Sequence, residues 1–328
     1  MSLIVDNFNR KVEYLRLSVT DRCDFRCVYC MSEDPSFLPR EHVLSLEELA
    51  WIAQAFTELG VKKIRLTGGE PLVRTDCDKL IELLGKLPGL DDLSMTTNGS
   101  RLSKLAQPMH DAGLKRLNIS LDTLNPELFT EMTRNGKVDR VIAGIDAAKA
   151  AGFKHIKINA VILRGKNDHE VIDLINFCRE RGLDISFIEE MPLGVMDERK
   201  RSRHCSSEEV RGIISETYPL LPSSKRTGGP ARYYKMADSD IHIGFISPHS
   251  NNFCHECNRV RVTVEGRLLL CLGNENSVDL KSIVREFPGD IGKLKDAILE
   301  GIQHKPKEHY FGTDDDVQIL RFMNSTGG

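Results

Sequence analysis

Residues 62–98, KKIRLTGGEPLVRTDCDKLIELLGKLPGLDDLSMTTN, contain one complete strand–helix–strand pattern. The runs KKIRLTG (62–68) and DLSMTTN (92–98) have the length and the apolar content of strands. Between them, residues 76–86 repeat apolar side chains at the spacing of one helix face. A helix is the usual connection between two parallel strands, so this stretch predicts an α/β protein.

The same alternation continues through the first two-thirds of the chain. Polar residues and glycines crowd the carboxyl ends of the predicted strands, which is where α/β barrels and open parallel sheets build their sites. Six units fall short of the eight that close a full barrel, so we expect an open, partial (βα)6 barrel of the TIM type. The other strands are expected at 15–19, 116–122, 156–163 and 184–192, and the other helices at 45–59, 101–112, 138–151 and 169–181.

After the sixth unit the regular alternation ends. A basic run at 199–203 and one helix pattern near 206–216 follow. Short strand-like runs come next, with two helix patterns near 279–286 and 290–303. We therefore expect three parts: the partial barrel at 1–193, a connecting segment at 194–230 and a C-terminal domain at 231–328.

The composition argues against some classes of function. A net charge of −3 gives no general attraction for nucleic acid or an anionic membrane, so an anion site would need a local group of Arg and Lys. The first residues, MSLIVDNFNRKVEYLRLSV, lack the pattern of a secretory signal, and no apolar run is long enough to span a bilayer. We expect a cytoplasmic protein, and in that reducing compartment nine cysteines indicate metal binding or catalysis rather than disulfides.

A first set of cysteines follows the first predicted strand. Cys23, Cys27 and Cys30 form a C-x3-C-x2-C run. Thiolates suit zinc and iron–sulfur clusters, and three of them on a four-iron cube leave one iron open for a small molecule. Zinc sites usually pair C-x2-C units, so the x3 step favours the open cluster. No ligand role is expected for the isolated cysteines Cys77, Cys178 and Cys205.

A second set comprises Cys254, Cys257 and Cys271, again without an evident fourth cysteine. His255 or His204 could complete a Cys3His zinc site. On spacing alone, zinc and an iron–sulfur cluster are equally favoured here.

Several segments resemble known families. CDFRCVYC (23–30) matches the signature of radical SAM enzymes, which use S-adenosylmethionine (SAM), and GGEP (68–71) resembles the motif that binds the SAM amino group in that superfamily. FCHECNRVRVTVEGRLLLCL (253–272) and the terminal Gly-Gly resemble the GTP 3′,8-cyclases that begin molybdenum-cofactor biosynthesis. One departure is Ser32, where the family usually has Pro after Met; it affects loop stiffness and leaves the three ligands in place.

The resemblance implies a reaction and its partners. It implies two [4Fe-4S] clusters, with SAM on the open iron of the first and the guanine of GTP on the second. The adenosyl radical would remove the hydrogen at C3′ of GTP, C3′ would bond to C8, and reduction would give 3′,8-cyclo-7,8-dihydro-GTP, which makes the protein a lyase. It also implies an electron donor such as flavodoxin or ferredoxin and, downstream, cyclic pyranopterin monophosphate synthase. A homodimer is compatible with the sequence.

The positions of the basic residues in the predicted strands by themselves indicate an anion-binding role. Arg259 and Arg261 are two residues apart, so on a strand they share a face. Arg16 and Lys157 interrupt apolar runs, where a buried charge costs free energy unless it is paired. A bound polyanion such as a triphosphate would supply the pairing.

The resemblance assigns roles to individual residues in three groups. For SAM it implies Tyr29, Gly69, Glu70, Ser120 and Met191; for GTP it implies Arg16, Arg65, Thr96, Lys157, Arg259, Val260 and Arg261; for the cyclisation it implies the terminal Gly327 and Gly328.

Two other functions stay open at this point. A radical SAM enzyme that modifies peptides would also carry an auxiliary cluster after the barrel. A zinc-stabilised α/β protein with two Cys3His sites would not be an enzyme at all.

Overall fold

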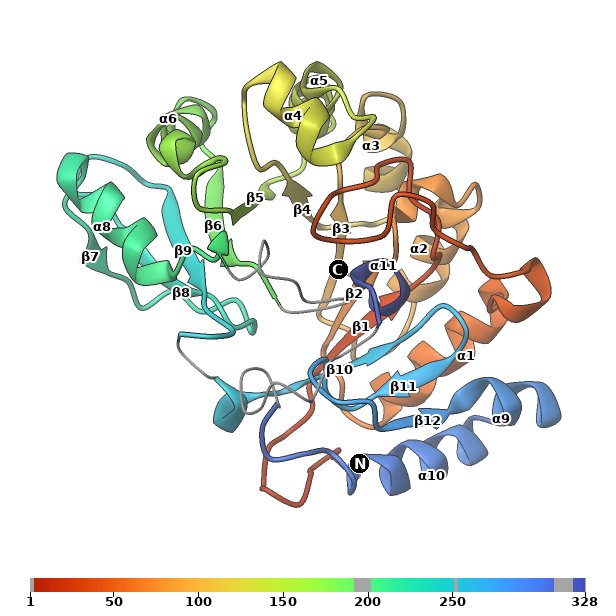
Figure 1. The fold of residues 1–328 in the computed structure, drawn as a ribbon. Coiled ribbons are helices and arrows are strands. Elements are labelled where there is room, and N and C mark those ends of the chain that lie inside the picture. Colours follow the sequence, from red (N-terminus) through yellow and green to blue (C-terminus); the bar gives the residue numbers. More distant parts are fainter. Residues whose placement is uncertain (1–2, 192–201, 251–252, 310–320, 328) are drawn as a thin grey trace.

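The structure, a computed structural model, describes residues 3–191, 202–250, 253–309 and 321–327. It confirms the predicted partial barrel, whose helices cover the outer face of a curved parallel sheet (Figure 1). The six strands are β1 (Tyr14–Ser18), β2 (Lys63–Thr67), β3 (Asp92–Thr97), β4 (Arg116–Ser120), β5 (His155–Ile162) and β6 (Asp184–Glu189). The predicted helices are α1 (Leu46–Glu58), α2 (Cys77–Gly85), α3 (Leu102–Asp111), α5 (Val138–Ala150) and α6 (Val171–Arg181).

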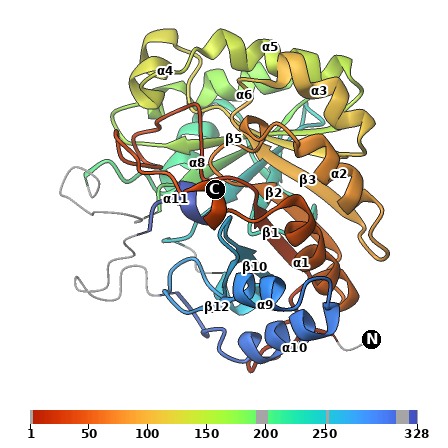
Figure 2. The ribbon, with the colours of Figure 1, turned by 90° about the vertical axis from the view of Figure 1, so that its right-hand side faces the viewer.

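The C-terminal part of the chain adds strands to both edges of this barrel. The whole sheet has the order β12-β11-β10-β1-β2-β3-β4-β5-β6-β9-β8-β7. The added strands are β7 (Leu221–Pro222), β8 (Arg232–Lys235), β9 (His242–Ile246), β10 (Arg259–Val262), β11 (Arg267–Leu269) and β12 (Ser277–Asp279). The helices of this part are α8 (Ser207–Thr217), α9 (Leu280–Glu286), α10 (Ile291–Ile302) and α11 (Met323–Thr326), and Figure 2 shows α9 beside β12, with α10 below them.

Two consecutive strands, β9 and β10, lie at opposite edges of the barrel. β9 pairs with β6 and β10 pairs with β1, both in parallel. The chain therefore crosses from one edge to the other between Ile246 and Arg259. Cys254 and Cys257 lie on this crossing, which brings the second cysteine set to the open side of the barrel.

The two faces of the sheet differ in polarity, because successive strand side chains point to opposite sides. On the outer face, Leu15, Leu17, Ile64 and Leu66 are completely buried in the core beneath the helices. The inner face instead carries polar side chains that line a cavity: Arg16, Arg65, Thr96, Asn118 and Lys157. A barrel that only needed a packed core would be apolar inside, so this interior is suited to a polar ligand.

The structure contains one helix between β4 and α5 that was not predicted, α4 (Pro126–Thr133). Asn125 and Pro126 look like a turn in the sequence. In the structure the Asn125 side chain accepts hydrogen bonds from the amides of Glu127 and Leu128, at 2.9 and 3.0 Å, and Pro126 is the first helical residue. The pair is therefore a helix cap followed by an N1 proline.

The connecting segment contains the predicted helix as α8, which begins with a capping box between Ser206 and Glu209. Residues 199–201 of the basic run lie outside the described residues, while Arg203 pairs with Glu190. The division of the chain at 193 and 230 stays a prediction, since strands from both sides of these positions join one sheet. Among the described residues, no helix is both long and apolar enough to cross a membrane.

Candidate active site

The first cysteine set lies on a loop that leaves the carboxyl end of β1. The amide of Cys30 donates a hydrogen bond to the carbonyl oxygen of Cys27 at 3.0 Å, which closes a tight turn around Tyr29. The amides of Arg26 and Val28 donate to the last residues of α4, Thr133 and Met132, each at 3.0 Å. The unpredicted helix α4 therefore holds the cysteine loop in place.

The double glycine after β2 packs directly against this loop. The amides of Gly69 and Glu70 donate to the carbonyl oxygens of Thr20 and Arg22, at 2.7 and 2.8 Å. A Cβ on Gly68 would lie 2.4 Å from the Thr20 oxygen, and one on Gly69 would lie 2.4 Å from the Arg22 oxygen. Both positions exclude any side chain, so the observed close approach is between the GGEP turn and the cysteine loop.

The three thiols of the first set fit a metal cluster by their surroundings. Burial raises the pKa of Cys23 and of Cys30 to about 12. N–H groups nevertheless point at the Cys23 sulfur, from the Phe25 amide at 3.4 Å and the Asn98 side chain at 3.8 Å. Such donors are typical around cluster sulfurs, and bound iron would supply the positive charge that a buried thiolate needs.

Two carboxylates organise the surroundings of the first set. Glu70 accepts hydrogen bonds from the amides of Leu72 and Asn98 and from the Thr97 hydroxyl, at 3.0, 2.6 and 2.7 Å. Burial nevertheless raises the pKa of Glu70 to about 7. Glu70 thus ties together the segments that follow β2 and β3.

Asp122 is the second of these carboxylates, and it was not among the predicted site residues. The Tyr29 hydroxyl donates to it at 2.6 Å, and the Val161 amide donates at 2.8 Å. Burial raises the pKa of Asp122 to about 6. Its position at the carboxyl end of β4, two residues after Ser120, was the signal that could have found it.

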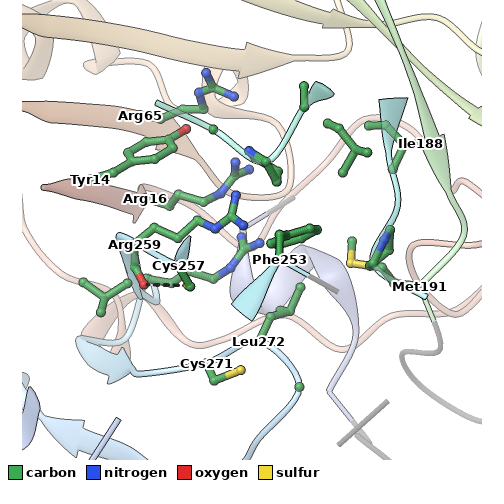
Figure 3. Close-up of a pocket in the computed structure, with 18 of the residues that line it drawn as sticks. Tyr14, Arg16, Arg65, Ile188, Met191, Phe253, Cys257, Arg259, Cys271 and Leu272 are labelled. Atoms are coloured by element: carbon green, nitrogen blue, oxygen red, sulfur yellow. Dashed lines mark hydrogen bonds between the residues drawn. The ribbon is translucent and has the colours of Figure 1, made fainter. Parts of the chain in front are cut away.

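A cavity inside the barrel collects the predicted GTP residues. Arg16, Arg65, Thr96, Lys157, Arg259, Val260 and Arg261 all line it, together with Cys254, Cys257 and Cys271 of the second set. In Figure 3 the guanidinium groups of Arg16, Arg65 and Arg259 point into it from one side, with Ile188 and Met191 opposite. Of the residues predicted for SAM, only Met191 lines the cavity; Tyr29, Gly69, Glu70 and Ser120 lie outside its lining.

The cavity is strongly cationic. Burial lowers the pKa of Arg16 to about 10, and burial together with Arg65 and Arg116 lowers the pKa of Lys157 well below its usual value. The Lys157 ammonium contacts the hydroxyl of Tyr233, at 3.2 Å, and not a carboxylate. Within the described parts of the chain, Arg65, Lys157, Arg259 and Arg261 form no ion pair with Asp or Glu.

Asn118 is a cavity residue that sequence reasoning missed. The strand register places Asn118 of β4 between Thr96 of β3 and Lys157 of β5. Asn118 is 2% exposed, and among the described residues neither its side-chain nitrogen nor the Thr96 hydroxyl has a hydrogen-bond partner. The alternation with Ser120, two residues later, was the available sequence signal.

The chain end lies between the two cysteine sets. The Met323 amide donates to the Cys30 carbonyl oxygen at 3.1 Å, and Arg261 donates to the carbonyl oxygen of Gly327. Figures 1 and 2 both show α11 next to β1, on the inner side of the sheet. Gly328 lies outside the described residues.

The second cysteine set lies on the crossing after β9 and on the loop after β11. The Lys305 ammonium contacts the Cys257 sulfur at 3.5 Å, and the Cys257 thiol donates to the backbone carbonyl oxygen of Arg259 at 3.9 Å, the contact drawn in Figure 3. Burial raises the pKa of Cys257, but Lys305 and Arg259 outweigh it and bring the value down to about 7. A thiol of this kind readily becomes a thiolate ligand.

Neither candidate histidine completes a zinc site. His255 is exposed and lies beside Glu256, while His204 stacks edge-on against His249 with ring centres 5.1 Å apart. In the described part of the chain, no three His, Cys, Asp or Glu side chains are placed to hold one metal ion. A four-iron cube is larger than one ion and takes one thiolate per iron, which suits wider spacing.

The curved parallel sheet, the cysteine loop after β1 and the Gly-Gly-Glu turn after β2 together define a radical SAM protein. The model of the Radical SAM superfamily matches residues 17–178, and that of Molybdenum Cofactor Synthesis C matches residues 183–311. The chain belongs to the GTP 3′,8-cyclase family. It is 59% identical over 327 residues to the GTP 3′,8-cyclase of Pseudomonas entomophila (strain L48) and 57% identical over 326 residues to that of Ectopseudomonas mendocina (strain ymp), and each comparison covers 99% of this chain and 98% of the relative.

Solved structures show the same fold at low identity. Streptococcus suis SuiB bound to S-adenosylmethionine has a TM-score of 0.63 and 18% identity, over 90% of this chain and 69% of SuiB. SuiB bound to the precursor peptide SuiA has a TM-score of 0.60 and 18% identity, over 94% of this chain and 76% of SuiB. The superfamily uses SAM and a [4Fe-4S] cluster, so this chain is a SAM-dependent iron–sulfur enzyme.

Proposed function

We propose that this chain is a lyase that converts GTP into 3′,8-cyclo-7,8-dihydro-GTP in molybdenum-cofactor biosynthesis. Full-length identity to the cyclases supports this assignment. The observation that carries it is the cavity, where five cations and the three cysteines of the second set line one space. A nucleoside triphosphate needs both: cations for its phosphates and a separate site for its base.

The first cluster is assigned to Cys23, Cys27 and Cys30, and the second to Cys254, Cys257 and Cys271. When bound, the first cluster and SAM supply an adenosyl radical, and the second cluster offers an open iron to the guanine. The cation-lined cavity and the N–H donors around Cys23 support the assignment of both sites.

The cations of the cavity would bind the triphosphate. Arg16 and Arg65 occupy one register row across β1 and β2, and Arg261 joins that row from β10. Lys157 faces them from β5, and Arg259 begins β10. Guanidinium groups suit bidentate contact with phosphate oxygens, so this row would fix the triphosphate and thereby the ribose.

Residues near the cysteine loop would hold SAM. Glu70 would accept a hydrogen bond from the SAM ammonium, and Tyr29, on the cysteine loop, and Ser120, at the end of β4, would provide further SAM contacts. Met191, which lines the cavity, would contact SAM from that side, and Gly69 would hold the GGEP turn against the cysteine loop. In this arrangement the radical source would lie on one side of the ribose and the base site on the other, with Gly327 between them.

The remaining partners follow from the proposed reaction. The cycle consumes electrons, which a flavodoxin or ferredoxin would deliver, and the product would pass to cyclic pyranopterin monophosphate synthase. A homodimer belongs to the same set of expectations.

One experiment tests the substrate directly. The protein is reconstituted anaerobically and incubated with SAM, dithionite and GTP, and the products are separated by chromatography before mass analysis. Separation is needed because the product is an isomer of GTP: the hydrogen lost from C3′ is balanced by one proton and one electron. We expect the cyclic product and GTP-dependent deoxyadenosine; equal SAM cleavage without GTP would contradict the proposal.

The peptide-modifying alternative predicts a different binding result. A peptide has no need of a cavity lined by five cations, and among the described residues Arg65, Lys157, Arg259 and Arg261 form no ion pair with Asp or Glu. We therefore expect GTP to bind at micromolar concentrations by equilibrium dialysis, and an absence of binding would favour the peptide substrate.

A further inference from the structure

A buried lysine lies behind the second cysteine set. Lys305 follows α10 and is 3% exposed. Its ammonium contacts three acceptors: the carbonyl oxygen of Leu270 at 2.6 Å, that of Arg259 at 3.3 Å and the sulfur of Cys257 at 3.5 Å. Neither the proposed SAM site nor the proposed triphosphate site uses this residue.

The burial of Lys305 requires a compensating negative charge. A buried ammonium is unfavourable unless it is hydrogen-bonded and paired with a negative charge. Two carbonyl oxygens supply dipoles but no charge. Among the described residues no carboxylate forms an ion pair with Lys305, and the third contact of its ammonium is the sulfur of Cys257, which would be a thiolate as a ligand of the proposed cluster.

The same ammonium also connects two of the chain segments that carry the ligands. Arg259 lies two residues after Cys257, and Leu270 directly precedes Cys271. Lys305 therefore holds the start of β10 and the loop after β11 at a fixed separation.

The segment of the third cysteine, Cys254, is hydrogen-bonded to Arg10, which also contacts the turn that contains Lys305. The guanidinium of Arg10 donates to the carbonyl oxygen of Cys254 at 2.8 Å and to those of Pro306 and Lys307 at 2.6 and 2.7 Å. Arg10 is itself paired with Asp6 at 2.6 Å. Residues 305–307 thus contact two of the cysteine segments directly through Lys305 and are joined to the third, that of Cys254, through Arg10.

We infer that Lys305 is a positioning residue of the second cluster: its ammonium neutralises one ligand thiolate, holds two ligand segments together and keeps the cluster's reduction potential high. A cluster becomes more negative when it is reduced, so an adjacent positive charge stabilises the reduced form more than the oxidised form. Loss of that charge should shift the potential to a more negative value. The inference rests on the proposed second cluster.

The test uses the full chain after anaerobic reconstitution, with variants Lys305→Met, Lys305→Gln and Lys305→Arg. Lys307→Met is the matched control, because that side chain is two residues away and exposed. A background with Cys23, Cys27 and Cys30 replaced by Ala leaves the second cluster as the one signal. Iron content and an EPR-monitored redox titration are measured.

We expect about four irons per chain in this background, a more negative potential in the Met and Gln variants, and a potential near the unsubstituted value in the Arg and control variants. Loss of the cluster in Lys305→Met and Lys305→Gln, but not in Lys305→Arg, would also show that the positive charge at this position is needed. An unchanged potential in Lys305→Met or Lys305→Gln, with the cluster retained, would overturn it, as would cluster loss in all three variants, which indicates packing alone. If the background binds no iron, the proposed second cluster fails instead, and the two failures are distinguishable.

Discussion

The guanidinium of Arg261 donates a hydrogen bond to the carbonyl oxygen of Gly327 and so joins a cation of the cavity to the end of the chain. Gly327 has a φ of 78°, and a Cβ there would lie 2.2 Å from the Thr67 hydroxyl. The tail therefore passes close to β2, between the two cysteine sets. Its position can be tested because only glycine fits it.

Gly327→Ala should displace the tail from the cavity. We expect at least a tenfold loss of cyclic product, while the iron content stays unchanged. Gly289→Ala is the control, because Gly289 has a similar φ of 76° but its Cβ would meet nothing closer than 4.0 Å. The two variants share the backbone strain and differ in the collision. Equal product yields from both would show that the tail position is irrelevant.

Removal of one cavity cation should weaken GTP binding. A hydrogen bond to a charged group contributes about 1.5–3 kcal/mol, so we expect Arg259→Gln to raise the Kd for GTP roughly tenfold to a hundredfold. Arg232→Gln, on the exposed side of β8, serves as the control. Equilibrium dialysis at two salt concentrations gives the measurement. The same Kd in both variants would remove Arg259 from the triphosphate site.

Asn118 should contribute a hydrogen bond to the substrate. Its side-chain nitrogen is buried and unpartnered in the register row between Thr96 and Lys157. We expect Asn118→Ala to weaken GTP binding about fivefold, since a neutral hydrogen bond contributes about 1 kcal/mol. Asn118→Asp should weaken it more, because a carboxylate would repel the phosphates and pair with Lys157. Unchanged affinity for GTP in both variants would argue against a contact between Asn118 and the substrate.

The sequence predicted the parts of this fold that depend on local periodicity. The six strands of the barrel match their apolar runs to within one or two residues, except β6, which ends at Glu189 rather than at 192. The charges inside apolar runs also indicated the cavity residues Arg16 and Lys157, whereas Arg65 was predicted from the family resemblance.

The sequence could not predict contacts between distant segments. Lys305 and Arg10 look like ordinary surface charges until the fold brings them against Cys257 and Cys254. The pairing of β9 with β6 and of β10 with β1 is likewise a long-range event, so nothing local reveals that the second set spans the barrel opening. Only the family resemblance indicated that the second set faces GTP.

The two cysteine sets should be separable by substitution. Cys254→Ala should reduce the iron content from about eight to about four per chain, abolish the cyclic product and leave SAM cleavage by the first cluster measurable. Cys205→Ala is the control, because Cys205 is buried in the apolar core away from both sets. The measurements are the iron content and the amounts of the cyclic product and of deoxyadenosine. Full cyclisation by Cys254→Ala would mean that the second set has no part in the reaction.

Asp122 should make stability depend on pH. Burial raises its pKa from 3.8 to about 6. A carboxyl whose pKa is raised in the folded state binds its proton more tightly there, so its contribution is fully present below about pH 4 and is lost as the pH rises through 6. At about 1.4 kcal/mol per pKa unit, the loss is on the order of 3 kcal/mol.

Asp122→Asn should remove this loss, because an amide can accept from the Val161 amide and donate to Tyr29 without ionising. The measurement is the free energy of unfolding of cluster-free protein by denaturant between pH 4 and pH 7. As the pH rises across this window, we expect the free energy of unfolding of Asp122→Asn to increase relative to that of the unsubstituted protein. Parallel pH profiles would show that the Asp122 carboxyl titrates normally, and the Tyr29 contact would then not depend on its protonation.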